Sequence, residues 1–306
     1  MILERMATQL ALTPPFLLKL AASASHRYKE YKIPKKTGGE RTIHHPAREI
    51  KLLQYWLLRN LVVNLPVHPL ATAYRKESSI RENAALHVAN NYILRVDFND
   101  FFHSLKGSDV VSVLAANRQR LADEVLTDLD IRLTRQIVCR LDCLTIGAPT
   151  SPVLSNAIMF EFDVRWSEMA RTEDVTYSRY ADDLYFSTNR PNVLESVLER
   201  LRESLRAQRA PTLTINDRKT SFSSRKRRRL AAGLVLTSDR KISIGRKKKR
   251  RLKALVNNLK RRQLPMEQMA HLRGWIAYLG SVEPAFVTAL EKKYDLDFKS
   301  NITWEV

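Results

Sequence analysis

The chain has 306 residues, 44% of them hydrophobic, with 52 Lys and Arg against 32 Asp and Glu, a formal net charge of +20. This hydrophobic fraction excludes wholesale disorder, and the length predicts one large domain or two to three small ones. Cys139 and Cys143 are too few for a disulfide framework, and no Cys/His cluster has zinc spacing. Glu4 and Arg5 interrupt the N-terminal apolar stretch, which argues against a signal peptide, and no apolar run reaches the roughly 18 residues of a membrane span. We therefore expect a cytoplasmic protein without a membrane partner.

The positive charge is concentrated in one region. Residues 218–262 contain 19 Lys and Arg and one acidic residue, Asp239, a net +18, so the other residues, 33 basic and 31 acidic, contribute only +2. Such a basic region attracts polyanions, and nucleic acid is the partner that we expect. The alternative is a solvated basic face that keeps the protein soluble.

Hydrophobic periodicity predicts helices and strands in alternation along the chain. The N-terminal part is expected to contain two short helices within 1–24, a basic hairpin of strands 28–33 and 41–44, a helix over 50–61, and a helix that begins at a capping box at Ser79. The remaining expected elements are a strand over 92–98, helical structure over 108–140, a helix over 153–170, a hairpin of strands 175–180 and 184–187, a helix over 192–207, a strand at 213–215, a hairpin over 230–244 and three helices over 246–293. This order predicts an α+β fold with a sheet of three or four strands backed by helices.

Acidic residues lie at the ends of two predicted strands. Asp97 is near the end of the strand over 92–98, and Asp182 and Asp183 form the turn of the later hairpin. A shared sheet would bring them together, and carboxylates without His or Cys suit Mg²⁺. Two such ions support nucleotidyl transfer or phosphodiester hydrolysis. The structural alternative is that Asp182 and Asp183 only satisfy hydrogen bonds in their turn.

Three segments around these acids resemble motifs A, B and C of reverse transcriptases. They are Arg95-Val-Asp-Phe-Asn-Asp-Phe-Phe102, Ile146-Gly-Ala-Pro-Thr-Ser-Pro152 and Tyr180-Ala-Asp-Asp183. Asn83-Ala-Ala-Leu-His87 is similar to the Asn-Ala-x-x-His signature of retron enzymes. Further similarities are Arg41–Pro46 to the fingers motif, Ile215–Thr220 to motif D, and Gly274-Trp275 to the thumb. On these motifs, most of the chain resembles a retron-type reverse transcriptase.

The resemblance implies a right-hand polymerase with N-terminal helices and fingers at 1–90, a palm at 91–240 and a basic helical thumb at 241–306. The implied activity is RNA-directed DNA synthesis from dNTPs with two Mg²⁺ ions. The template would be a dedicated structured non-coding RNA, and the product branched multicopy single-stranded DNA. By analogy, an effector or toxin protein of an anti-phage defence system is the expected protein partner.

The resemblance also implies residue roles. The expected catalytic residues are Asp97, Asp182, Asp183 and Lys219. The expected metal ligands are Asp97, the Phe98 carbonyl, Asp182 and Asp183; Asp97 and Asp182 would bridge both ions, and Lys219 would protonate pyrophosphate. The expected nucleotide-binding residues are Lys35, Lys36, Arg41, Gly147 and Phe102, the last as a steric gate against a 2′-hydroxyl. The expected RNA- or DNA-binding residues are Asn83, His87, Tyr180, Arg246, Lys247, Lys248, Arg250, Arg251 and Trp275.

Two positions depart from the family pattern, and several roles have alternatives. Ile146 replaces the usual motif B glutamine, and Ala231-Ala-Gly233 replaces the retron Val-Thr-Gly. Lys219 could act only through its charge, His87 could be structural, and Trp275 could belong to the thumb core. Rival functions are a diversity-generating or CRISPR-associated reverse transcriptase, against which the Asn-Ala-x-x-His signature argues, and a non-catalytic RNA-binding scaffold, against which the three aspartates argue.

Overall fold

The computed structural model of the chain describes residues 2–35, 38–121 and 126–298. Lys36, expected to bind the nucleotide, lies outside these residues. The helices are α1 (Ile2–Leu10), α2 (Pro14–Ala22), α3 (Arg48–Asn60), α4 (Ile80–His87), α5 (Phe101–Ser104), α6 (Gly107–Ala116), α7 (Asp128–Val138), α8 (Ser151–Ile158), α9 (Phe160–Thr172), α10 (Val193–Ala207), α11 (Arg246–Lys260), α12 (Met266–Val282) and α13 (Pro284–Tyr294), with 3-10 turns at Ala24–His26 and Val62–Asn64. The strands are β1 (Tyr28–Pro34), β2 (Glu40–Pro46), β3 (Tyr92–Asp97), β4 (Thr176–Tyr180), β5 (Asp183–Thr188), β6 (Ser221–Ser224), β7 (Arg229–Ala231), β8 (Leu234–Leu236) and β9 (Ile242–Ser243). The predicted α+β class is confirmed.

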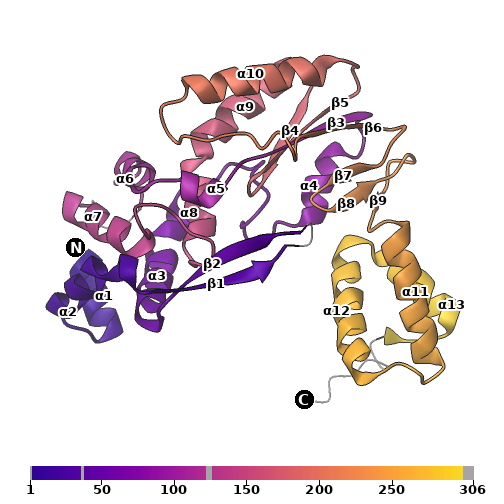
Figure 1. Cartoon of the computed structure of the whole chain (residues 1–306), viewed down its shortest axis with the longest axis horizontal. Helices are drawn as coiled ribbons and strands as arrows, with labels where there is room; N and C mark the ends of the chain where they lie inside the picture. Colours follow the sequence, from indigo (N-terminus) through magenta and orange to yellow (C-terminus); the bar gives the residue numbers. More distant parts are fainter. Residues whose placement is uncertain (1, 36–37, 122–125, 299–306) are drawn as a thin grey trace.

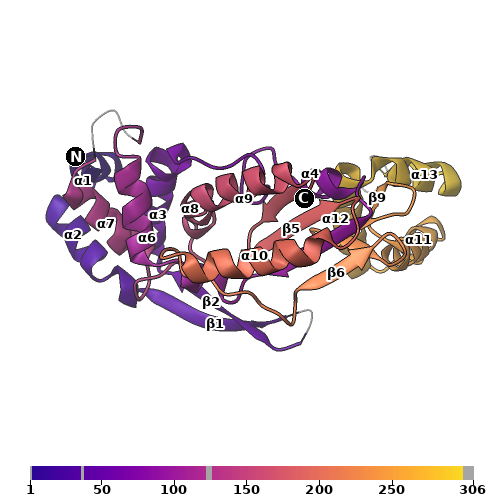
Figure 2. The same ribbon diagram turned by 90° about the horizontal axis from the view of Figure 1, so that it is seen from above.

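The elements form three regions along the long axis of the molecule. Helices α1, α2, α3 and α7 lie at one end, the sheet of β3 to β6 lies in the middle, and α11, α12 and α13 form a helical group at the other end (Figure 1). The β1–β2 hairpin begins beside the N-terminal helices and extends from them along one side of the molecule (Figure 2). Among the described residues, none of the helices combines the length and the apolarity that a membrane span requires.

The central sheet is antiparallel, with the strand order β4-β5-β3-β6. The pairing of β3 with β5 sets Asp97 directly opposite Asp183. The predicted meeting of the first acidic strand with the later acidic hairpin is therefore confirmed.

Four predicted elements differ in the structure. The segment 213–215 is not a strand: Ile215 makes only an isolated bridge to Phe98, and the edge strand is β6. The predicted hairpin over 230–244 is a three-stranded sheet, β7-β8-β9. The helical region 108–140 is two helices, because Asn117 caps α6 and a Thr127–Asp130 capping box begins α7. The helix over 153–170 is divided at Met159 into α8 and α9.

Alternation along β4 directs side chains to two opposite layers of the protein. Tyr177 and Arg179 contact Asp163 on α9, whereas Ser178 between them contacts Asn83 and His87 on α4. This follows from the two-residue period of a strand. The main hydrophobic core lies on the α9 side, and a second core joins α4 to β7, β8 and the C-terminal helices.

A buried ion pair joins β4 to α9. Arg179 and Asp163 both have 0% exposed side chains, and the guanidinium contacts both carboxylate oxygens, with Nε–Oδ1 at 2.8 Å and Nη2–Oδ2 at 2.5 Å. The Tyr177 hydroxyl donates to the same carboxylate (2.6 Å). Arg179 Nη1 also donates to Asn156 on α8 and to the Ala181 carbonyl, both at 3.1 Å. The pair therefore fixes α8 and α9 to the turn that carries Asp182.

We expect Asp163→Ala to lower the free energy of unfolding by about 3–5 kcal/mol, because it leaves the Arg179 charge buried without its partner. Urea unfolding monitored by circular dichroism measures the change. The matched control is Glu40→Ala, which breaks the exposed Lys32–Glu40 pair (3.0 Å, side chains 61% and 60% exposed). That loss should be below about 1 kcal/mol. Equal small losses in both variants would contradict the prediction.

Candidate active site

Three aspartates meet where β3 ends and where β4 turns into β5. Asp97 ends β3 and is 3% exposed, and Asp183 lies opposite it at the start of β5. Ala181 and Asp182 form the intervening turn, and Ala181 has a left-handed φ of 57°. The Phe98 N–H donates to the Asp182 carbonyl (3.2 Å), which holds this turn against the end of β3.

Two cationic side chains contact two of these carboxylates. Lys219 Nζ lies 2.7 and 3.0 Å from the oxygens of Asp97. Arg95 donates from Nε and Nη2 to the two oxygens of Asp183, each at 2.9 Å. The Tyr185 hydroxyl also donates to Asp183 (3.2 Å). Lys219 was predicted from its motif, whereas the role of Arg95 was missed, because nothing in an isolated strand sequence shows which carboxylate the guanidinium will reach.

Burial and mutual repulsion raise the pKa values of the clustered carboxyl groups. The pKa of Asp183 is raised to about 6, first by burial and then by the charges of Asp182 and Asp97, while Arg95 opposes the shift. The pKa of Asp182 is also raised, first by burial and then by Asp97, while Lys219 and Arg41 oppose the shift. The cluster is therefore a place where positive charge is stabilised.

The donor chemistry of this cluster fits Mg²⁺, because carboxylates and a backbone carbonyl are hard oxygen ligands. Among residues 2–35, 38–121 and 126–298, no three His, Cys, Asp or Glu side chains are grouped as a ready-made metal site. Lys219 and Arg95 contact the oxygens that would bind an ion at Asp97 and Asp183. Metal binding at Asp97 thus requires the Lys219 ammonium group to move, which its 55% exposed side chain permits.

The predicted nucleotide-binding residues of the fingers differ in their positions. Arg41 on β2 is exposed, and its charge acts on Asp182 in the direction that lowers the pKa of that carboxyl group, so the two groups lie within electrostatic range of each other. Lys35 is exposed at the turn of the hairpin, where its N–H donates to the Gly39 carbonyl (2.9 Å). Gly147 has a φ of +114° and lies so close to β2 that an added Cβ would be 2.6 Å from the His44 carbonyl oxygen. Gly147 therefore permits the motif B loop to approach the hairpin.

Aromatic rings lie beside the carboxylates. Phe98 and Phe101 are 2% and 3% exposed and stack with centroids 5.9 Å apart, so both rings belong to the core. Phe102 is only partly buried, and its ring contacts Phe101 (5.5 Å) and Tyr74 (6.4 Å). Tyr74 was missed by the sequence analysis, because a single tyrosine in a loop belongs to no periodic pattern.

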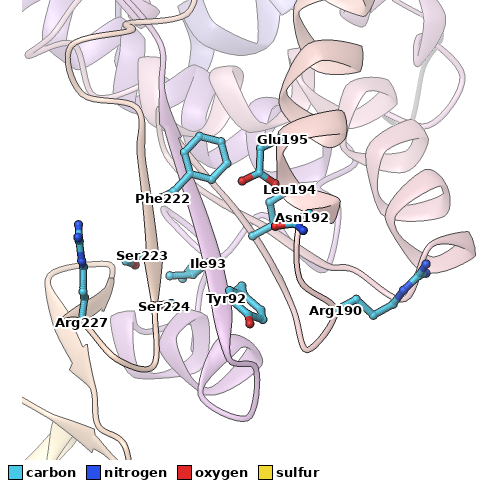
Figure 3. Close-up of a pocket in the computed structure, with 10 residues that line it drawn as sticks. All are labelled: Tyr92, Ile93, Arg190, Asn192, Leu194, Glu195, Phe222, Ser223, Ser224 and Arg227. Atoms are coloured by element: carbon cyan, nitrogen blue, oxygen red, sulfur yellow. The ribbon is translucent and has the colours of Figure 1, made fainter.

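A separate pocket of about 220 Å³ lies between β3, β6 and the start of α10. Its lining includes Tyr92, Asn192, Glu195 and Phe222 (Figure 3). Tyr92 begins β3 whereas Asp97 ends it, so the pocket lies at the other end of this strand from the carboxylates. It takes no part in the site described above.

Comparisons with known proteins agree with this geometry. The reverse transcriptase (RNA-dependent DNA polymerase) family matches residues 33–270. The retron Ec83 reverse transcriptase of Escherichia coli is 34% identical over 92% of this chain and 91% of its own length. The retron Ec73 and Ec86 reverse transcriptases of Escherichia coli are 34% and 33% identical, over 89% and 90% of this chain and 88% and 85% of their own lengths. The chain belongs to the retron reverse transcriptases. It is an RNA-dependent DNA polymerase.

A solved structure supports the fold of this retron reverse transcriptase. Telomerase from Candida albicans, in complex with a fragment of telomeric RNA, has a TM-score of 0.51 and 16% identity over 90% of this chain. The chain spans about half (55%) of the telomerase chain. This likeness concerns the fold alone.

The Asn-Ala-x-x-His signature lies inside the retron reverse transcriptase. Asn83 and His87 are both 0% exposed, so the prediction that they contact RNA is wrong for these two side chains. Asn83 Nδ2 donates to Thr72 Oγ1 (3.0 Å) and Ser178 Oγ (2.7 Å). The two ring nitrogens of His87 contact Ser187 Oγ and Ser178 Oγ, each at 2.7 Å. Because buried polar groups need partners, this network fixes α4 on β4 and β5, and the structural alternative for His87 holds.

The residues predicted to bind nucleic acid through the thumb lie on α11 and α12. A set of basic side chains is exposed at the start of α11: Arg246, Lys247, Lys248, Arg250 and Arg251. Trp275 on α12 is partly buried, with Lys248 Nζ 5.6 Å from its ring centroid and its Nε1 donating to His271 (3.0 Å). Its ring meets Tyr278 edge to face at 5.5 Å, and both rings pack with Tyr180 against the second core.

Gly147→Ala should destabilise the retron reverse transcriptase by about 1–3 kcal/mol, because the methyl group meets a backbone carbonyl and φ is in the left-handed region. Chemical unfolding of the purified variant tests this. The matched control is Gly280→Ala in α12, where an added Cβ meets nothing within 4 Å. There the substitution should stabilise the helix by up to about 1 kcal/mol. Stabilisation by both substitutions would show that the motif B loop tolerates a side chain.

His87 should make the protein acid-sensitive. Burial lowers the pKa of His87 to about 3, whereas an unfolded histidine titrates near about 6.5. The unfolded state therefore binds the extra proton as the pH falls below about 6.5, and stability decreases by about 1.4 kcal/mol per pH unit down to about pH 3. Urea unfolding at pH 7.5 and 5.0 should show a loss about 2 kcal/mol smaller in His87→Gln than in the parent. The same loss in both proteins would rule out His87 as the cause.

Proposed function

We propose that this retron reverse transcriptase copies a dedicated structured non-coding RNA into branched multicopy single-stranded DNA, within a cytoplasmic anti-phage defence system. The observation that carries the proposal is the register that places Asp97 opposite Asp183 with Asp182 in the adjoining turn. The retron relatives, similar over about nine-tenths of the chain, support the choice of RNA and product. An effector or toxin protein would act with the enzyme.

The proposed division of the chain is fingers at 1–90, palm at 91–240 and thumb at 241–306. The β1–β2 hairpin would close over the triphosphate, and the sheet of β3 to β6 would carry the catalytic carboxylates. The exposed basic residues at the start of α11 would hold nucleic-acid phosphates without reading sequence, as phosphate contacts do. Tyr180 and Trp275 would lie along the primer and the new duplex.

In the proposed mechanism, Asp97, Asp182 and the Phe98 carbonyl would hold two Mg²⁺ ions, which would supply Lewis-acid activation of the attacking hydroxyl and positive charge for the leaving pyrophosphate. Arg41 orients the triphosphate. Phe102 occupies the space of a ribonucleotide 2′-hydroxyl. Lys219, once released from Asp97, donates a proton to the departing pyrophosphate oxygen. Asp183 stays with Arg95 and maintains the charge balance of the site.

We expect the enzyme, purified with its nucleic acid and treated with RNase, to retain a discrete short DNA. Asp182→Asn should abolish this DNA and reduce primer extension on RNA by at least about 1,000-fold, because a carboxylate that would hold the metal ions is lost. Gel analysis of the bound DNA and extension assays with Mg²⁺ and dNTPs measure both effects.

The matched control is Asp128→Asn, at an exposed aspartate of α7, which should retain DNA and activity. Bound RNA without any DNA, together with an inactive parent enzyme, would instead favour the RNA-binding scaffold. Full DNA synthesis by Asp182→Asn would refute the metal assignment.

A further inference from the structure

Tyr74 is presented to the carboxylates by a loop that is held on both sides. Thr72, two residues earlier, donates through its backbone N–H (2.8 Å) and its hydroxyl (3.2 Å) to the Arg179 carbonyl. The Ala73 carbonyl accepts from Asn156 Nδ2 (2.8 Å). After Tyr74, Arg75 donates to the Pro69 carbonyl (2.8 Å) and pairs with Glu82 (2.7 Å). Both neighbours of Tyr74 are thus fixed by contacts to other segments.

The backbone of Tyr74 itself is strained. Its φ is 59°, in the left-handed region that a bulky residue seldom adopts. Such strain persists only where surrounding contacts determine the conformation, and the contacts of Thr72, Ala73 and Arg75 do so here. Asn83 contributes directly, because its amide donates to the Thr72 hydroxyl. The retron signature therefore helps to hold the loop that carries this ring.

The Tyr74 side chain faces the predicted nucleotide site. It is 46% exposed, and its ring centroid lies 6.4 Å from that of Phe102. Burial of the phenol raises its pKa to about 12, with the charges of Asp182 and Tyr180 adding to the shift and Arg41 opposing it. The phenol therefore lies within electrostatic range of Asp182 and Arg41, which are assigned to metal and triphosphate.

We propose that Tyr74 forms, together with Phe102, an aromatic wall of the pocket for the incoming deoxynucleoside triphosphate. Tyr74 contacts the base and sugar of the nucleotide with the face of its ring, on the side of the site where Arg41 meets the triphosphate. This role rests on the proposed positions of Phe102 and Arg41 in the polymerase site. Ile146 has no side-chain amide that could contact the nucleotide at the motif B position. In this proposal the ring of Tyr74 supplies nucleotide affinity instead.

The test uses single-nucleotide incorporation by the full-length enzyme on a primed RNA template. Tyr74→Gly removes the ring and suits the left-handed backbone, so it should fold at least as stably as the parent. Its KM for dNTP should rise about ten-fold with kcat changed by less than about three-fold, because a stacking contact is lost. Tyr74→Phe, which keeps the ring, should stay within about three-fold of the parent in KM. The matched control is Glu77→Gly, an exposed residue of the same loop with a φ of 63°, which should leave KM unchanged.

A second measurement is independent of turnover. The Kd of dNTP for the enzyme bound to template and primer, measured with Ca²⁺ in place of Mg²⁺, should also rise about ten-fold in Tyr74→Gly. An unchanged Kd, or a loss confined to template binding or to kcat, would overturn the role of Tyr74. An inactive parent that still binds dNTP more tightly than Tyr74→Gly would contradict the proposed function and leave this inference standing.

Discussion

The buried Arg179–Asp163 pair is the contact on which the site most depends. Two charges without solvent exposure are tolerated only when their remaining hydrogen-bonding groups are satisfied, and here Tyr177, Asn156 and the Ala181 carbonyl satisfy them. The backbone of Arg179 also holds the loop before α4, since its N–H donates to Leu70 and its carbonyl accepts from Thr72. One residue next to Tyr180 therefore connects α8, α9, the turn that carries Asp182 and the loop that carries Tyr74.

The opposite face of the same strand carries a neutral network instead of an ion pair. The Ser178 hydroxyl accepts a hydrogen bond from Asn83 and makes a second one with His87. Asn90 adds to this network by donating to the hydroxyls of Ser187 (2.7 Å) and Thr176 (3.0 Å). Burial keeps His87 uncharged, so the network itself contains no buried positive charge. The signature that identified the family by sequence is thus a structural device that fixes α4 and positions the Thr72 loop.

Patterns in the sequence predicted which strand ends carry the acidic residues. They did not predict contacts in which the partner of a side chain comes from a distant segment of the chain. The acids of β3 and of the β4–β5 turn were placed together correctly, because strand order brings strand ends to one edge. The roles of Arg95 and Tyr74 were missed, since each depends on a partner that only the fold supplies. Asn83 and His87 were assigned to RNA through the family resemblance, but the resemblance does not show whether their side chains are buried. The segment 213–215 has the composition of a strand, but it makes only the isolated bridge between Ile215 and Phe98. Directly after it the backbone N–H groups of Lys219 and Thr220 donate to the Asn216 carbonyl, and this turn ends the extended segment.

The two cations at the carboxylates differ in how firmly they are held. The planar guanidinium of Arg95 contacts both oxygens of Asp183 from a strand that pairs with the strand of Asp183, and two parallel hydrogen bonds hold the carboxylate in this geometry. Lys219 reaches Asp97 with a flexible, half-exposed side chain from a turn outside the sheet, and an ammonium group is readily exchanged for another cation. Asp183 is consequently fixed in its ion pair while Asp97 can exchange its partner. This asymmetry supports the assignment of metal binding to Asp97 and Asp182, and a metal ion held by Asp97 would free the ammonium group of Lys219 for proton transfer.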